Sequence, residues 1–455
     1  MIKRINKTIN SYLFKQLVKT LQKGGITVLI IGLLTQMSLA QDKTLTLDEA
    51  IKLGIANSKT LKLSQSKIDA AVSQYNQVKD QVLPTGSASF TFDRAQIPAN
   101  TLDLGASTIH LPDGANAYIG LAGINEVIYG GYRYRYAQLS TDLLTQVARL
   151  DADKDKDQIT YDVISAYYNL YKVLQSQKVV DKNIAAVAVQ LQQAQRFFDQ
   201  GLVTKNDVLR FQLQKANIQL NGIDLESNRR VINYSLDVLL GLPEGTQLKI
   251  DEIKDSGLTP APLSNYLDTA LTTRQELKQL DLQNKVAETN IKSIQAAQLP
   301  TVSVGANVYY IDASGNPIPQ YGSYITPLTI GATISWNFSS LWTNKNKVAS
   351  AKIEQDQTTI RKSITVDNLK TEINRNYQSY VMALDKIKLL QTSIAQAGEN
   401  NKILESKYQS NIASATDRVD AQTLLYQAQI NLELAKADAG LAYYTLLKST
   451  GKLNK

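Results

Sequence analysis

Apolar residues occupy every second position in four short segments of this chain. In the last of them the positions in between are mostly polar, and the apolar set is Leu328, Ile330, Ala332, Ile334, Trp336 and Phe338. A period of two is typical of β-strands that have one apolar face. The pattern predicts strands over about 86–95, 117–128, 301–311 and 327–338.

A second pattern, with steps of four and three, fills most of the remaining chain. In the first half it is carried by Ile159, Val163, Ala166, Leu170, Val173, Gln177, Val180, Ile184, Val187, Leu191, Ala194 and Phe198. Sustained alternation of this kind predicts a coiled-coil seam. The stretch 344–408 contains no proline and only one glycine, Gly398. As a single helix it is on the order of 100 Å long, which a compact globular domain cannot accommodate.

The two halves of the chain repeat the same order of segments. The phrase "FDQGLVTKNDVLRFQ" (Phe198–Gln212) matches "YQSNIASATDRVDAQ" (Tyr408–Gln422), and the strand pairs match at a similar offset. A fixed offset indicates an internal duplication. We therefore predict a helix–strand–strand–helix–helix repeat over 41–241 and again over 263–455, joined by a linker at 242–262. The turns between the paired helices are expected near 201–205 and 411–415.

The N-terminal residues 1–40 have the parts of a secretory signal. Six basic residues and no acidic one accompany the apolar run Ile26–Leu34, and small residues follow at Ser38–Ala40. We predict cleavage after Ala40, with an uncleaved anchor helix as the alternative. Removing these six charges from the net charge of +8 leaves +2. A nearly neutral remainder argues against a nucleic-acid partner.

The residue types exclude several kinds of chemistry. The chain has no cysteine, which excludes disulfides, thiolate metal sites and an N-terminal lipid anchor. Its single histidine, His110, stands beside Pro112 and Gly114 and is predicted to be a solvated loop residue. The sequence shows no glycine-rich phosphate loop and no nucleophile elbow. We expect no cofactor, no metal site and no enzyme.

Four strands of this kind raise the question of what covers their apolar face. A tilted strand of about 9–11 residues crosses a bilayer, and alternation is the pattern of outer-membrane barrels. Four strands cannot close a barrel, and lipid does not tolerate an open sheet edge. If the strands are transmembrane, two or more chains must therefore share one barrel.

The duplicated layout resembles the TolC family of outer-membrane efflux proteins across the whole mature chain. The phrases "GLVTKNDVLRFQ" (Gly201–Gln212) and "ATDRVDAQTLLYQAQINL" (Ala415–Leu432) are similar to the two helix tips of that family. The resemblance implies a homotrimer in the outer membrane of a Gram-negative bacterium, with four strands per chain forming a twelve-stranded barrel. It also implies a coiled-coil tunnel in the periplasm and a belt formed by the linker. The implied partners are a periplasmic adaptor, an inner-membrane pump and outer-membrane lipid. The implied activity is export of small molecules or proteins, with opening by movement of the helix tips.

The same resemblance assigns roles to residues at the tips. Asp417 and Asp420 match two acids that line the closed entrance of such tunnels, as two stacked rings in a trimer. The residues alone offer a second interpretation, in which these acids favour a helix start and Ser414 or Thr416 is the N-cap.

Other tip residues match a lock that holds the entrance closed. Asp207 and Tyr408 occupy two of its positions, whereas Ala413 stands where the family pattern has an arginine, and Arg418 is a candidate substitute. Gly201 and Asn411 are the predicted tip turns, since both residue types accept a left-handed backbone.

A periplasmic coiled-coil adaptor, or a structural protein of an envelope complex, is the alternative function. Two tandem copies, each with an inserted strand pair, favour the channel.

Overall fold

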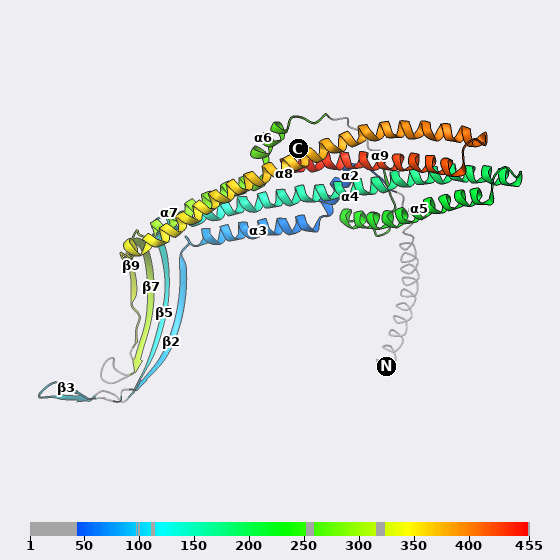
Figure 1. Cartoon of the computed structure of the whole chain (residues 1–455). Helices are drawn as coiled ribbons and strands as arrows, with labels where there is room; N and C mark the ends of the chain where they lie inside the picture. The colour runs from blue at the N-terminus through cyan, green and yellow to red at the C-terminus, as the bar shows by residue number, and fades with distance from the viewer. Residues whose placement is uncertain are drawn as a thin grey trace, which may run out of the picture. The chain divides into compact units, whose positions relative to one another are not determined.

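The computed structural model describes residues 43–96, 98, 101–110, 114–251, 259–314 and 324–453 (Figure 1). The predicted signal peptide and the linker residues 252–258 lie outside the described residues. The chain divides into two compact units, which are considered separately. Unit 1 comprises residues up to Asn57, Asp162–Leu258 and Met382–Leu441, and unit 2 comprises Ser58–Tyr161, Thr259–Val381 and the residues from Ala442 onward.

Long helices dominate both units. Two helical hairpins are formed by α4 (Arg133–Asp199) with α5 (Lys205–Leu240), and by α8 (Ser340–Gln409) with α9 (Ala415–Thr450). Shorter helices are α2 (Leu47–Asn57), α3 (Lys59–Asp80), α6 (Leu263–Thr273) and α7 (Gln275–Ala296). The prediction of a mainly helical fold with very long helices is confirmed. None of the described helices combines the length and the hydrophobicity that a membrane crossing requires.

The predicted seam on α4 accounts for much of the packing in the part that belongs to unit 1. Val163, Leu170, Val180 and Val187 are fully buried, as the 4-3 spacing predicts. Phe198, at the end of the seam, is instead partly exposed because α4 ends at Asp199.

Unit 2 contains an antiparallel sheet in the order β2-β5-β7, with β9 beside β7. Its strands are β2 (Thr85–Gln96), β5 (Gly114–Tyr129), β7 (Thr301–Ser314) and β9 (Leu328–Ser335), and the two-residue β8 (Tyr324–Ile325) also pairs with β7. The last strand ends three residues before the predicted 338. The main-chain carbonyl of Asn337 accepts hydrogen bonds from the Ser340 nitrogen (3.1 Å) and hydroxyl (2.6 Å), which start α8.

A short hairpin of β3 (Thr101–Asp103) and β4 (Thr108–His110) was not predicted from the sequence. His110 is exposed, but it ends a strand instead of lying in a loop.

The strand register gathers apolar side chains on one face of the sheet. Val308 pairs with Leu328, and Ala306 pairs with Ile330 and with Ile124. Because side chains alternate between faces, these residues share a face. The large apolar side chains on it are exposed in the single chain, namely Phe90, Phe92, Ile124, Val304, Val308, Leu328, Ile330 and Ile334. An apolar face of this extent requires a partner or a membrane.

A small parallel pair of strands in unit 1 holds the linker against α5. Strand β1 (Lys43–Leu45) pairs with β6 (Leu248–Ile250), over a core that includes Leu236 and Leu240. The Asn233 side chain accepts a hydrogen bond from the Leu248 nitrogen (3.0 Å) and donates one to the Thr246 carbonyl (2.6 Å). One buried amide therefore fixes the position of the linker strand.

Asp237 lies beside this amide and gives a pH-dependent prediction. Its side chain is fully buried and accepts a hydrogen bond from Asn233 (3.0 Å). Burial raises the pKa of Asp237 to about 6, although hydrogen bonds from Gly245 and Asn233 oppose the shift. Because the folded-state pKa lies above the unfolded value, the group favours the folded state at low pH. This contribution is lost as the pH rises through about 6.

We therefore expect Asp237→Asn to stabilise unit 1 by about 2 kcal/mol near pH 7.5, and to have little effect near pH 4. Denaturation midpoints of the two proteins at both pH values measure this difference. An equal difference at the two pH values would show that the carboxyl group does not titrate in this range.

Candidate functional site at the helix tips

The two helical hairpins of unit 1 end in turns of the same geometry. Gly201 follows α4 with a φ of 70°, and Asn411 follows α8 with a φ of 55°. In both turns the next residue donates a main-chain hydrogen bond back across the helix end, from Leu202 to Phe197 (2.9 Å) and from Ile412 to Lys407 (2.8 Å). This is the Schellman arrangement, which needs a left-handed residue at the turn. The structure thus places both predicted turn residues at the tips.

Each tip then starts its second helix with a capping box. At the first tip, the Asp207 carboxylate accepts hydrogen bonds from the Thr204 nitrogen (2.8 Å) and hydroxyl (2.7 Å). At the second tip, the Asp417 carboxylate accepts hydrogen bonds from the Ser414 nitrogen (3.1 Å) and hydroxyl (2.8 Å). Both hydroxyls in turn accept from the main-chain nitrogen three residues later. Ser414, and not Thr416, is therefore the N-cap of α9.

The capping box stabilises the charged form of Asp417 and leaves its side chain exposed. Hydrogen bonds from the Ser414 hydroxyl, and then from its main chain, lower the pKa of Asp417. Asp417 and Asp420 are both exposed, and the spacing of three places them on one face of α9. Both therefore present carboxylates on the same exposed strip of the helix.

Tyr408 joins the two tips through an apolar cluster. It is only 4% exposed and packs with Ala194, Val208, Phe211 and Ala415. Its hydroxyl has no hydrogen-bond partner within the described residues. Burial raises the pKa of Tyr408, and the negative charge of Asp207 raises it further. The charge of Asp207 thus acts on Tyr408, while the carboxylate of Asp207 is held by Thr204.

Arg418 connects α9 to α8. Its side chain is only 3% exposed, it donates a hydrogen bond to Asn401 Oδ1, and its Nη2 lies 3.6 Å from Glu405 Oε2. Burial lowers the pKa of Arg418, while the negative charge of Glu405 opposes that shift. The guanidinium therefore braces the second hairpin internally, and Ala413 packs against the Tyr408 cluster.

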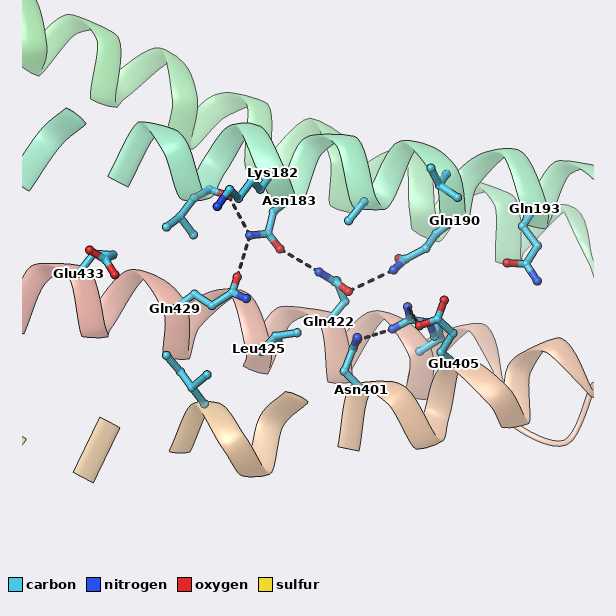
Figure 2. A pocket seen from close by; sticks show the side chains of 15 residues that line it. Lys182, Asn183, Gln190, Gln193, Asn401, Glu405, Gln422, Leu425, Gln429 and Glu433 are labelled. Carbon is cyan, nitrogen blue, oxygen red and sulfur yellow. Dashed lines mark hydrogen bonds and ion pairs between the residues drawn. The ribbon is translucent and has the colours of Figure 1, made fainter. Parts of the chain in front are cut away.

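A cavity of about 560 Å³ lies beside Arg418, between α4, α8 and α9 (Figure 2). One wall is a ladder of amide side chains. Gln422 donates to Asn183 (2.8 Å), Gln190 donates to Gln422 (3.2 Å), and Asn183 donates to Gln429 (3.2 Å). Buried amides that are hydrogen-bonded to one another specify the register in which two helices pack. The cavity lining is mostly polar, and no cluster of three acidic or histidine side chains suited to a metal ion occurs in the described part of the chain.

This ladder was missed at the level of sequence. Its signal is the spacing of seven that separates Ser176, Asn183 and Gln190 on α4, and Gln422 and Gln429 on α9. A polar residue at every seventh position marks a second buried line beside the apolar seam.

The comparisons with known proteins identify the family. The model of the outer membrane efflux protein family matches residues 266–452. The toluene efflux pump outer membrane protein TtgC of Pseudomonas putida is 24% identical over 403 residues, which cover 84% of this chain and 78% of that protein. Outer membrane protein TolC of Escherichia coli is 20% identical over 407 residues, with coverages of 87% and 80%. Residues 266–452 match this family, and most of the chain is similar to TolC-type outer-membrane efflux proteins.

The fold of an outer membrane protein of known structure agrees with this similarity. The outer membrane protein VceC of Vibrio cholerae has a TM-score of 0.73 at 15% identity, covering 89% of this chain and 96% of that chain. Together with the family match and the relatives, this fold supports an outer-membrane efflux channel of the TolC type. Members of this family are transport proteins, which confirms the prediction that the chain is not an enzyme.

Proposed function

We propose that three copies of this efflux protein form one channel, in which twelve strands close a barrel in the outer membrane and the helices form a periplasmic tunnel. The observation that carries the proposal is the sheet of unit 2. Strands β2 and β9 lie at its two edges, and its apolar face is exposed. In lipid, every edge must be paired, so β9 of one copy has to meet β2 of the next.

A stripe of exposed apolar residues on α5 supports assembly with further copies of the chain. Its members recur mainly at steps of three, four and seven along the outward face of the helix and are Leu209, Leu213, Leu220, Ile223, Val231, Tyr234 and Val238. Such a stripe is suited to a helix of a second chain and is costly to leave in water. The α5 stripe and the open sheet edges therefore both favour a closed ring of copies.

The proposed partners follow from this geometry and from the family. A tunnel whose helix tips lie in the periplasm receives cargo from an inner-membrane pump through a periplasmic adaptor. The relative TtgC is named as the outer-membrane protein of a toluene efflux pump, which supports small molecules as cargo. Proteins are the second cargo class.

The proposed gate is the ring of helix tips. In a trimer, Asp417 and Asp420 form two acidic rings at the entrance, which attract cations and allow a multivalent cation to block the pore. Asp207, Tyr408 and Arg418 hold the closed tips together. Opening separates the tips around Gly201 and Asn411.

The test is the conductance of the purified protein in planar bilayers, with and without a trivalent cation. We expect a small cation-selective conductance that the cation blocks. In Asp420→Asn and Asp417→Asn the blocking concentration rises at least tenfold, since each variant removes three charges from the axis.

Asp207→Asn is the matched control, because it loses the same capping-box carboxylate at the other tip. Because Asp207 belongs to the proposed lock, we expect this variant to open more often, but to retain the cation block because it lies outside the acidic rings. If the cation blocks Asp417→Asn and Asp420→Asn at the wild-type concentration, the two carboxylates act only in starting the helix. A folded oligomer that never conducts would contradict the channel and favour a periplasmic adaptor.

A further inference from the structure

Four glycines lie within the described helices, and one of them differs from the rest. At three positions an added Cβ would meet a side chain of another helix: Gly54 near Val163 (2.5 Å), Gly222 near Val180 (3.3 Å) and Gly440 near Tyr168 (2.2 Å). At Gly398 on α8 nothing lies within 4 Å of that position. Its φ is not in the left-handed region. Neither packing nor backbone geometry therefore requires a glycine at residue 398.

Gly398 falls in register with the residues of α8 that line the cavity. Ile394, Asn401 and Glu405 contribute to the lining, and Gly398 lies four residues after the first and three before the second. Residues at this spacing share one helix face. Gly398 therefore lies on the cavity side of α8, where the missing side chain leaves space.

The segment that follows Gly398 is attached to α9. Arg418 of α9 contacts Asn401 and Glu405, both within seven residues of the glycine. Figure 2 shows Asn401 and Glu405 beside the cavity. Further on, Tyr408 packs against Ala415 at the start of α9. The end of α8 and the start of α9 are thus one braced tip.

Among the described residues that line the cavity, no hydrogen bond or ion pair joins α4 to α8. Beyond the cavity, Tyr408 at the end of α8 packs against Ala194 of α4, a contact that movement of the tip has to release. The amide ladder joins α4 to α9, through Asn183 and Gln190, and the cavity separates α4 from the face of α8 that carries Gly398. A bend in α8 at this point has room to occur without breaking the ladder. Glycine is the helix residue that resists bending least, because it adds backbone freedom and no side-chain contacts.

We propose that Gly398 is the hinge of the gate, at which α8 bends so that the braced tip moves across the cavity relative to α4. This inference rests on the proposed channel function. It assigns the moving part to residues 399–409 of α8 together with the first turn of α9, which ends before Gln422 of the amide ladder. It also accounts for the position of the cavity beside Gly398, where neither packing nor backbone geometry requires a glycine.

The test uses the full-length oligomer in planar bilayers and compares opening frequencies. Gly398→Ala fits the open space, so the fold is retained while the helix becomes stiffer. We expect it to open about three to five times less often, the ratio that the helix propensities of alanine and glycine imply. The double variant Ala397→Gly/Gly398→Ala moves the flexible point by one residue and is expected to restore opening to within about twofold.

Asn400→Ala is the control for a general increase in helix propensity. Asn400 is exposed and lies in the same helical turn as Gly398. It should open as often as the wild type. The hinge proposal is contradicted if Gly398→Ala opens at the wild-type frequency. It is also contradicted if the opening frequency of the double variant stays as low as that of Gly398→Ala. A wild-type oligomer without any openings would instead contradict the channel function itself.

Discussion

We expect Ile330→Lys to prevent stable insertion of the efflux protein into the outer membrane, whereas Thr329→Lys is tolerated. Ile330 is 81% exposed on the apolar face of the sheet, and Thr329 is its neighbour on the opposite face. A lysine that faces the middle of a bilayer costs about 2–4 kcal/mol, and a trimer carries three of them. In the proposed barrel, a lysine at residue 329 faces the lumen and stays in contact with water.

Carbonate washing of isolated membranes measures this difference. The wild type and Thr329→Lys should stay with the membrane pellet, and Ile330→Lys should be extracted or degraded. Because the two residues are adjacent in β9, local strand propensity cannot explain a difference between them. Equal retention of both variants would mean that the apolar face does not contact lipid.

The second large effect is expected at Arg418. Replacing it by alanine removes the buried guanidinium that contacts Asn401 and Glu405, and leaves a space at the core of the second hairpin tip. Loss of a fully buried partner costs about 3–5 kcal/mol. Glu405 is about half exposed, so water compensates for part of the loss and we expect about 2 kcal/mol. A loosened tip should open more often, which is the opposite of the effect expected for Gly398→Ala.

Two measurements check the Arg418→Ala variant. Its channel should show a higher opening frequency in bilayers, and limited proteolysis should cut its tip near Asn411 faster. Lys402→Ala is the control, since Lys402 is an exposed cation on the same segment of α8. If Arg418→Ala matches this control in both measurements, the guanidinium does not brace the tip.

The features that depend on periodicity were predictable from the sequence. The 4-3 spacing on α4 identified Val163, Leu170, Val180 and Val187, which are buried. The alternation of residues from Leu328 onward identified a strand, because a period of two or of 3.5 is a property of consecutive residues.

Features that depend on distant residues were not predictable. The pairing of Leu45 with Ile250 joins segments more than 200 residues apart, and each of the two strands is only three residues long and contains a lysine. The direction of Arg418 depends on the side-chain rotamer and on which helix lies nearest. Sequence alone left Ser414 and Thr416 equivalent as N-caps, since both carry the hydroxyl that the cap requires.

The antiparallel pairing of β5 with β7 has a consequence for the origin and assembly of the chain. It joins the hairpin of the first repeat to that of the second by the same kind of contact that joins the strands within each hairpin. In the proposed trimer, β9 of one copy meets β2 of the next in this way as well. The ring then contains six similar hairpins and six junctions between them, of which three lie within a chain and three lie between chains. Six copies of a single-repeat ancestor could have closed the same ring, and a present-day chain cut within the linker should still assemble from its two halves.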